Sequence, residues 1–118
     1  MKNRRVVVTG MGVVSPIGIG LNEFWTGLAE VKNGLDLITR FDNSRFDTKF
    51  GAELKNFDPA KFLNKKLIKR LDPYAQYALV SSMGAIEDSG IDLDQVDKNR
   101  FGVVFGSGIG GIKTMRVQ

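Results

Sequence analysis

Two short apolar runs of β-branched and aromatic residues stand near opposite ends of the chain. Residues Arg5–Thr9 read RVVVT and end at Gly10, and residues Phe101–Phe105 read FGVVF and end at a further glycine. Continuous apolar runs of this length, bounded by turn residues, are typical of strands that are buried on both faces of a sheet. Each run therefore predicts a buried β-strand.

A first helix and an irregular excursion follow the N-terminal strand. Residues Gly12–Gly18 are rich in turn-forming residues and predict a loop. Asn22 is the expected N-cap of a helix over Glu23–Glu30, because its side chain can accept a hydrogen bond from a free amide of the first turn. Residues Phe41–Phe57 show no sustained period, so we expect irregular structure there with one short strand at Phe50–Leu54.

Two Asp-Pro pairs mark the later helices, since aspartate is a good N-cap and proline suits the first helical position. The pair at 58–59 opens one helix or two, and the pair at 72–73 opens a helix over 73–89. Gly90 follows that helix where a left-handed residue is favoured. Because residues 73–89 are apolar nearly all round, we expect this helix to be buried. Buried strands separated by helices predict an α/β layered architecture.

Composition narrows the chemistry more than the fold. The chain has 118 residues, which predicts one domain, and it contains no cysteine and no histidine. Disulfides, thiolate nucleophiles, imidazole bases and the usual zinc sites are therefore excluded within it. The most apolar run, residues 6–14, is too short and too interrupted to cross a membrane, and no signal-peptide cleavage pattern follows it, so we expect a cytoplasmic protein.

The segment Gly106–Gly111 satisfies G-x-G-x-x-G after a predicted strand. It could be a dinucleotide loop, but the acidic residue that such a loop needs about 20 positions further on cannot be tested here. The P-loop alternative fails by one residue, because Ile112 separates Gly111 from Lys113. A tight strand-to-helix turn is the favoured interpretation, with a nucleotide site as the alternative. The earlier segment Gly10–Ser15 is a weaker candidate, because a proline follows it at once.

A basic cluster lies in the next predicted helical region. Its four cations fall along one helix face, with no acidic residue between positions 61 and 70: Lys65, Lys66, Lys69 and Arg70. Such a face attracts an acidic or phosphate-bearing partner, although a solvated helix face is favoured on the charge pattern alone. Nucleic acid is not expected, because aromatic residues do not interleave with these cations. We expect no metal and no cofactor.

Several longer stretches together resemble one enzyme family. The stretches RRVVVTGMGVVSPIG, FDNSRFDTKFGAELKNFD, KRLDPYAQYALVSSMGAIEDSGID and RFGVVFGSGIGGI are similar, in order and spacing, to the β-ketoacyl-acyl-carrier-protein synthases, the condensing enzymes of fatty-acid synthesis. The resemblance covers essentially all of the chain and is closest to the type II enzymes. It implies a thiolase-like αβαβα layered fold, of which residues 1–118 would be the first, incomplete part of the N-terminal domain.

The resemblance also implies an activity and site residues. The family condenses malonyl-acyl-carrier protein with an acyl chain and releases CO2, using a cysteine nucleophile and histidines that cannot be placed in this sequence. We therefore expect no catalytic residue here and no activity from the 118 residues alone. Ile109 is implied to line the acyl pocket and gate chain length. The cluster of Lys65, Lys66, Lys69 and Arg70 is implied to bind the acidic acyl-carrier protein, and the parent enzyme to be a homodimer.

Overall fold

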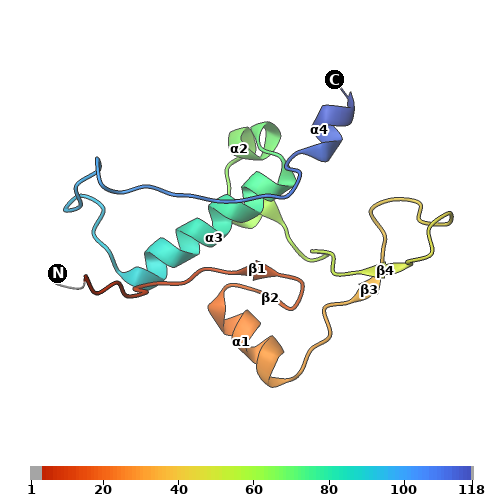
Figure 1. Ribbon diagram of the computed structural model, residues 1–118, viewed down its shortest axis with the longest axis horizontal. Helices are drawn as coiled ribbons and strands as arrows, with labels where there is room; N and C mark the ends of the chain where they lie inside the picture. The colour runs from red at the N-terminus through yellow and green to blue at the C-terminus, as the bar shows by residue number, and fades with distance from the viewer. Residues whose placement is uncertain (1–3, 118) are drawn as a thin grey trace.

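The longest helix, α3, is the element around which the other segments are arranged (Figure 1). The computed structural model describes residues 4–117, apart from the side chains of residues 113, 116 and 117. The elements in chain order are β1 (Val14–Ser15), β2 (Gly18–Ile19), α1 (Leu21–Ala29), β3 (Asp36–Leu37), β4 (Phe50–Gly51), the 3-10 helix η1 (Pro59–Lys61), α2 (Lys65–Arg70), α3 (Pro73–Ser89) and α4 (Ile112–Val117).

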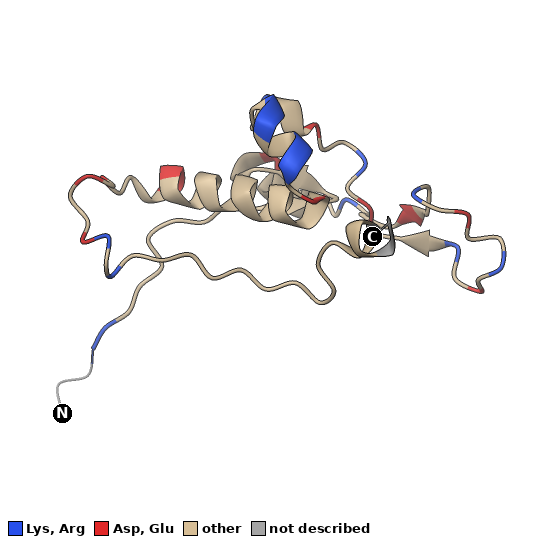
Figure 2. Cartoon of the chain, turned by 90° about the horizontal axis from the view of Figure 1, so that it is seen from above, with Lys and Arg blue, Asp and Glu red and all other residues tan. Residues whose placement is uncertain are grey.

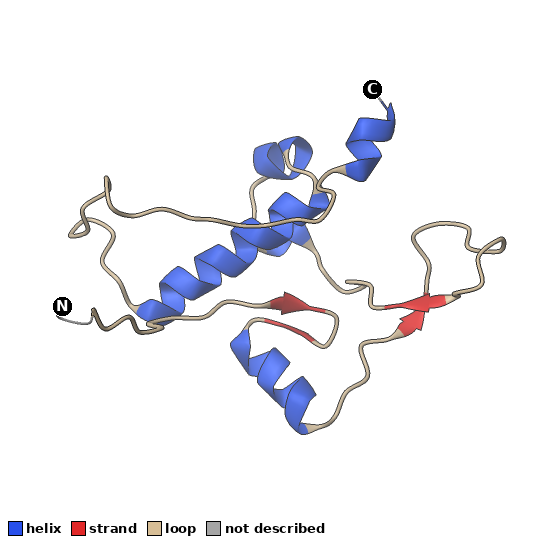
Figure 3. Ribbon diagram, in the orientation of Figure 1, coloured by secondary structure: helices blue, strands red, loops and turns tan. Residues whose placement is uncertain are grey.

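The two predicted buried strands are wrong for this chain. Residues 5–9 and 101–105 are drawn as loop in Figure 3, and their side chains are exposed: Val6 is 92% and Val104 is 99% exposed. A buried strand is stable only when neighbouring strands satisfy the amides and carbonyls along both its edges. Within residues 4–117 the strands form only two separate antiparallel pairs, β1 with β2 and β3 with β4. Neither apolar run therefore has a neighbour to pair with.

The short strands lie where the sequence predicts loops or irregular structure. β1 and β2 pair in the stretch expected to be a loop, with Val14 opposite Ile19, and the Ser15 hydroxyl donates to the Gly18 carbonyl at 3.0 Å. β4 confirms the short strand expected at 50–54, over its first residues only. Pairs this short place little of residues 4–117 in a sheet, so these residues do not confirm the layers implied by the resemblance.

The first helix begins earlier than the sequence predicts. α1 starts at Leu21, so the expected N-cap, Asn22, lies inside the first turn and does not cap it. Gly20 occupies the cap position with φ 85°, a left-handed backbone that glycine adopts without a Cβ clash. Glu23 in the first turn accepts a hydrogen bond from the Ile19 amide at 3.0 Å. The turn preceding the helix, rather than an asparagine side chain, sets its start.

The long helix is confirmed in its bounds but not in its burial. α3 spans Pro73–Ser89, and Gly90 closes it with φ 62°. Of its residues only Gln76 and Val80 are buried, while Met83 is 47% exposed. The helix is covered along one side by the N-terminal segment and near its start by η1 and α2 (Figure 1). Other apolar side chains of the helix, such as Leu79 and Ile86, are half-buried.

Glycines let the N-terminal segment approach α3 closely. A Cβ added at Gly10 would lie 2.7 Å from the Ser89 Cβ, and one added at Gly12 would lie 2.6 Å from the Ala85 amide nitrogen. Neither site has room for a side chain, so the segment can lie directly on the helix backbone. The first glycine motif is therefore explained by packing, and a dinucleotide loop is not needed to account for it.

The described chain is open. Its radius of gyration is 17.5 Å, whereas a compact domain of this length has about 13.5 Å. Its accessible surface is 10158 Å², whereas about 6,300 Å² is typical of a compact monomer of this mass. The difference is about 3,800 Å², and the two exposed valine-rich runs contribute to it.

Candidate functional site

The glycine turn at 106–111 has a defined geometry. The Ser107 hydroxyl accepts a hydrogen bond from the Gly110 amide at 2.9 Å, which closes the turn around Gly108 and Ile109. Gly110 has φ 76°, a conformation that a β-branched residue would adopt only with strain. Ile109 lies at the tip of this closed turn and is 67% exposed, and its role in an acyl pocket stays a prediction.

The start of α3 holds the second half of this turn. The Asp72 carboxylate accepts a hydrogen bond from the Thr114 hydroxyl of α4. A Cβ added at Gly111 would overlap the same carboxylate, and one added at Gly110 would lie 3.7 Å from the Tyr74 ring. The turn is therefore docked on the N-terminal end of α3, and α4 lies beside that end in Figure 1.

The position of the glycine turn against Asp72 does not favour the nucleotide-binding alternative. An anion bound at the turn would meet the negative charge of Asp72, which contacts Gly111. Phosphate sites at helix N-termini depend on free amides without a competing carboxylate. The P-loop interpretation depended on the spacing between Gly111 and Lys113. The side chain of Lys113 lies outside the part of the chain that the structure describes. The glycine motif is thus explained as a tight turn against α3.

The basic helix α2 is set in place by the helix that follows it. Asn64 caps α2, accepting a hydrogen bond from the Leu67 amide at 3.0 Å. At its other end, the buried Gln76 amide of α3 donates to the Ile68 carbonyl at 3.1 Å and to the Leu71 carbonyl at 2.8 Å. These bonds satisfy carbonyls that a helix end leaves free. They also fix which face of α2 is turned toward α3.

The four cations of α2 remain on the outside. Lys65, Lys66, Lys69 and Arg70 are all exposed. Figure 2 shows blue on α2 and no red, because the helix contains no acidic residue. Among residues 4–117 the ion pair found joins Lys55 to Asp36, so no carboxylate within the described chain neutralises this face. The structure thus brings the predicted basic cluster together as one exposed, positively charged surface, which we call the α2 basic face.

Asp58 and the preceding segment connect this face to a small apolar cluster. The Asp58 side chain accepts the Ala60 amide at 3.0 Å, which confirms the predicted N-cap, although the helix it opens, η1, is a single 3-10 turn. Phe57 stacks on Phe62 with ring centroids 5.9 Å apart and meets Tyr77 edge-on at 4.9 Å. This packing anchors η1 and α2 against α3.

A hairpin arm, residues 36–57, contacts α3 through Arg40 as well as through Phe57. The Arg40 guanidinium donates to the Leu54 carbonyl and to the Tyr77 hydroxyl, each at 3.0 Å. Within the arm, Lys55 donates to the Asp36 carboxylate at 2.7 Å. That hydrogen bond, with the charge of Lys55 and a backbone amide, lowers the pKa of the Asp36 carboxyl below its ordinary value. These polar contacts hold the arm, but they place no reactive group in it.

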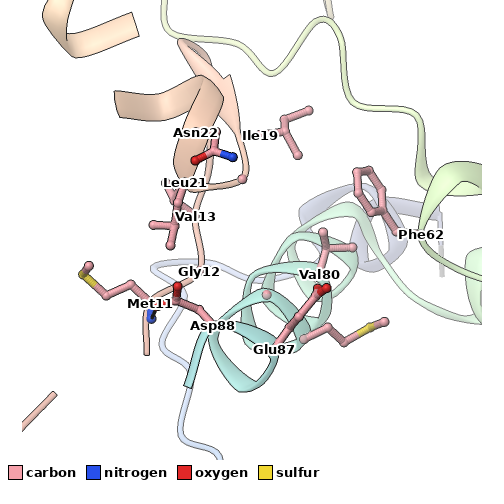
Figure 4. A pocket seen from close by; sticks show the side chains of 13 residues that line it. Met11, Gly12, Val13, Ile19, Leu21, Asn22, Phe62, Val80, Glu87 and Asp88 are labelled. Atoms are coloured by element: carbon pink, nitrogen blue, oxygen red, sulfur yellow. Dashed lines mark hydrogen bonds between the residues drawn. The ribbon is translucent and has the colours of Figure 1, made fainter. Parts of the chain in front are cut away.

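A hollow lies between the N-terminal segment, the start of α1 and α3 (Figure 4). It measures about 400 Å³ and is lined mainly by apolar side chains, including Val13, Phe62 and Val80. Glu87 and Asp88 stand at its edge, and Asp88 accepts a hydrogen bond from the Met11 amide at 2.8 Å. The hollow contains no nucleophile or paired acid and base, so its chemistry is that of an apolar recess.

The described residues, 4–117, form neither a metal-binding cluster nor a membrane-spanning helix. Within residues 4–117 no group of three or more potential metal-ligating side chains comes together. No helix in this part of the chain is long and apolar enough to cross a membrane. Sequence reasoning missed Asp72 and Ser107 as residues of the turn. The Asp-Pro pair at 72–73 was a signal, but it indicated a helix cap.

Comparison with solved structures defines the class of protein. The structure matches the ishigamide ketosynthase/chain length factor with a TM-score of 0.70 and 34% sequence identity, covering 79% of this chain and 23% of that one. It also matches a chain in a structure described as a type II PKS acyl-carrier protein in complex with its ketosynthase bound to the hexaketide. That match has a TM-score of 0.62 and 26% identity, and it covers 83% of this chain and 24% of that one. The fold is therefore of the ketosynthase class, an α/β fold of thiolase type.

The sequence comparison is more specific. Residues 3–118 match the family described as beta-ketoacyl synthase, N-terminal domain, and the chain belongs to this family. The family identified from the sequence motifs is thereby confirmed.

Two curated relatives illustrate this family. The chain is 46% identical over 112 residues to the 3-oxoacyl-[acyl-carrier-protein] synthase 2 of Coxiella burnetii, covering 95% of this chain and 27% of the relative. It is 42% identical over 118 residues to the protein of that name from Synechocystis, covering 100% of this chain and 28% of the relative. The chain thus spans little more than a quarter of the length of the curated relatives it matches.

Proposed function

We propose that this chain is the first part of the N-terminal domain of a 3-oxoacyl-[acyl-carrier-protein] synthase 2 that works in fatty-acid elongation. The observation that carries the proposal is the 46% identity to the Coxiella burnetii enzyme over nearly the whole chain. The parent enzyme would transfer an acyl group to its own thiol and join it to malonyl-acyl-carrier protein. The new carbon–carbon bond forms as the malonyl carboxylate leaves as CO2, and the enzyme thiol is released.

The 118 residues supply positioning and recognition in this scheme and not the bond-making groups. A thiolate nucleophile and imidazole groups cannot come from a chain with no cysteine and no histidine. The chain instead contributes the glycine turn that carries Ile109 and the α2 basic face. Ile109 would meet the acyl chain, because a branched apolar side chain at the tip of a turn can close a dry pocket and open it by changing rotamer.

The test of this function uses the full-length protein. Incubated with an acyl-acyl-carrier protein and malonyl-acyl-carrier protein, it should form 3-oxoacyl-acyl-carrier protein and release CO2 in equal amounts. The isolated 118-residue chain should form neither product. Condensation by the isolated chain, or the absence of condensation by a folded full-length protein, would refute the proposal. Titration with ATP or NAD(P) should give no heat, which separates this function from the nucleotide-binding alternative.

The α2 basic face is proposed as the docking surface for the acidic acyl-carrier protein. Four exposed cations without a neighbouring carboxylate attract an acidic partner and speed its association. The second matched structure, a ketosynthase described in complex with an acyl-carrier protein, supports this choice of partner. A non-catalytic module that binds an acidic partner through this face is the alternative if condensation is absent.

Charge reversal tests the docking surface. Lys69→Glu combined with Arg70→Glu in the full-length protein should weaken carrier-protein binding by at least about tenfold at low salt, and the salt dependence should decrease with it. Lys98→Glu with Arg100→Glu, on the exposed connection after α3, is the matched control and should change affinity little. Equal losses from both pairs would indicate only a change in net charge and would refute docking on α2.

The assembly of the parent enzyme belongs to the same proposal. The exposed apolar runs at 5–9 and 101–105 would become central strands of the layered thiolase-type fold when further strands lie beside them. The parent would be a cytoplasmic homodimer, which light scattering of the full-length protein can test.

A further inference from the structure

Asp72 does not do what its position predicts. It occupies the N-cap of α3, yet its side chain accepts no hydrogen bond from the first turn of that helix. Only its backbone carbonyl takes part in the helix, accepting the first intrahelical bond from the Gln76 amide at 3.0 Å. An aspartate at an N-cap that accepts no hydrogen bond from the first turn forgoes the stabilisation that capping gives a helix. Its carboxylate is therefore engaged elsewhere.

The carboxylate is directed to the turn that carries Ile109. One oxygen accepts the Thr114 hydroxyl, in the first turn of α4. The other lies against Gly111, where no side chain would fit. Forty-two residues separate Asp72 from Thr114, so this contact joins two distant parts of the chain. Tyr74, two residues after Asp72 in the first turn of α3, lies beside Gly110.

The turn is consequently fixed at both of its ends. Ser107 closes it internally through the Gly110 amide, and Asp72 fixes its exit into α4. Ile109 lies between these two points, and its side chain is 67% exposed. How easily Ile109 moves must then depend on how firmly the turn is held at Asp72.

We propose that Asp72 is a positioning residue that sets acyl-chain selectivity by pinning the turn that carries Ile109. This inference rests on the proposed function, in which Ile109 meets the acyl chain. While Asp72 holds Thr114, the turn resists displacement. Long acyl chains require Ile109 to move aside, so they are disfavoured relative to short ones. Without the pin the turn yields more easily, and long chains gain.

The experiment measures selectivity in the full-length synthase rather than total activity. The readout is the ratio of kcat/KM for a long acyl-acyl-carrier protein to that for a short one. Asp72→Ala and Thr114→Val should each raise this ratio at least about threefold, the effect of losing one net hydrogen bond. Thr114→Ser keeps the hydroxyl donor and should leave the ratio unchanged.

Two further variants separate positioning from general destabilisation. Asp58→Ala removes a cap that η1 does use, so it lowers stability without touching the turn, and the ratio should stay at the wild-type value. Ile109→Ala should raise the ratio by itself, and adding Asp72→Ala to it should cause no further rise, because the group through which Asp72 acts is gone.

The outcomes distinguish the inference from the function beneath it. If Ile109→Ala shifts the ratio but Asp72→Ala and Thr114→Val do not, the role of Asp72 is overturned and the proposed function stands. If Ile109→Ala leaves the ratio unchanged, the gate itself fails and the inference fails with it. If Asp72→Ala does not fold, the Thr114→Val and Thr114→Ser pair decides the question alone.

Discussion

Two glycines face each other where the N-terminal segment crosses α3, and they should respond to alanine in opposite ways. A Cβ at Gly12 would lie 2.6 Å from the Ala85 amide nitrogen and nearer still to the Ser81 carbonyl oxygen. Backbone atoms cannot rotate aside, so the segment must retreat by about 1 Å, and overpacking of this kind costs about 1–3 kcal/mol. Gly12→Ala should lower the free energy of unfolding by that amount.

Gly84 is the matched position on the helix. A Cβ there would lie 3.6 Å from the Gly12 Cα, an ordinary van der Waals contact. Alanine in place of glycine inside a helix stabilises it by about 1 kcal/mol. Gly84→Ala should therefore raise the free energy of unfolding, and the two variants should differ by about 2–4 kcal/mol.

Urea denaturation of the full-length protein, with hydrogen exchange of the α3 amides, measures this difference. The exchange rates at Ser81 and Ala85 should rise in Gly12→Ala and fall in Gly84→Ala. Equal effects of the two substitutions, or stabilisation by Gly12→Ala, would show that the N-terminal segment does not lie directly on the α3 backbone, and the packing account of the first glycine motif would be wrong.

Three other predictions follow from single features. Gly90→Ala should lower the free energy of unfolding by about 1–2 kcal/mol, because φ 62° is left-handed, and urea denaturation checks this. The hydrogen bond from Lys55 lowers the pKa of Asp36, so this contact is complete above the ordinary value of 3.8 and is lost as the pH falls through the lowered pKa. In an NMR titration, Lys55→Met should move the pKa of Asp36 upward. The same variant should leave the lowered pKa of Asp42 unchanged, because that shift arises mainly from the Ser44 amide. The isolated chain should bind a hydrophobic dye and melt without a cooperative transition, whereas a sharp transition of the monomer would contradict its open shape.

Local signals predicted the helices well where the signal and the structure concern the same few residues. The proline at position 73 and Gly90 bound α3 correctly, because a fixed φ and a left-handed residue act within one turn. Asn22 failed because a preceding turn at Gly20 starts α1 earlier and leaves nothing for its side chain to cap. When a turn that precedes a helix sets its first residue, the propensities of the residues inside the helix do not predict that start.

The candidate site was predicted in part. The α2 basic face follows from residue spacing alone, because cations four apart lie on one side of any helix. The seat of the glycine turn could not be predicted, since the contact between Asp72 and Thr114 spans a distance in sequence that no local pattern encodes. The same aspartate also fits the sequence pattern of a helix cap. An aspartate can cap a helix or accept a hydrogen bond from a distant hydroxyl, and only the tertiary structure selects between these two roles.

The wrong strand predictions and the correct family identification have one physical origin. Valine-rich runs such as 6–8 and 103–104 are suited to a sheet in which both faces and both edges are covered. Within this chain they are exposed, and the surface in excess of a compact domain, about 3,800 Å², is of the size that obligate interfaces bury. Under the proposed function these runs are strands whose neighbours the rest of the synthase supplies. The pattern of the sequence then fits the complete enzyme, while the glycines at 10 and 12 already hold the segment that follows the first of those runs on α3. That helix therefore links the part of the fold that forms locally to the part that needs further strands, and its start at Asp72 also holds the turn that bears Ile109.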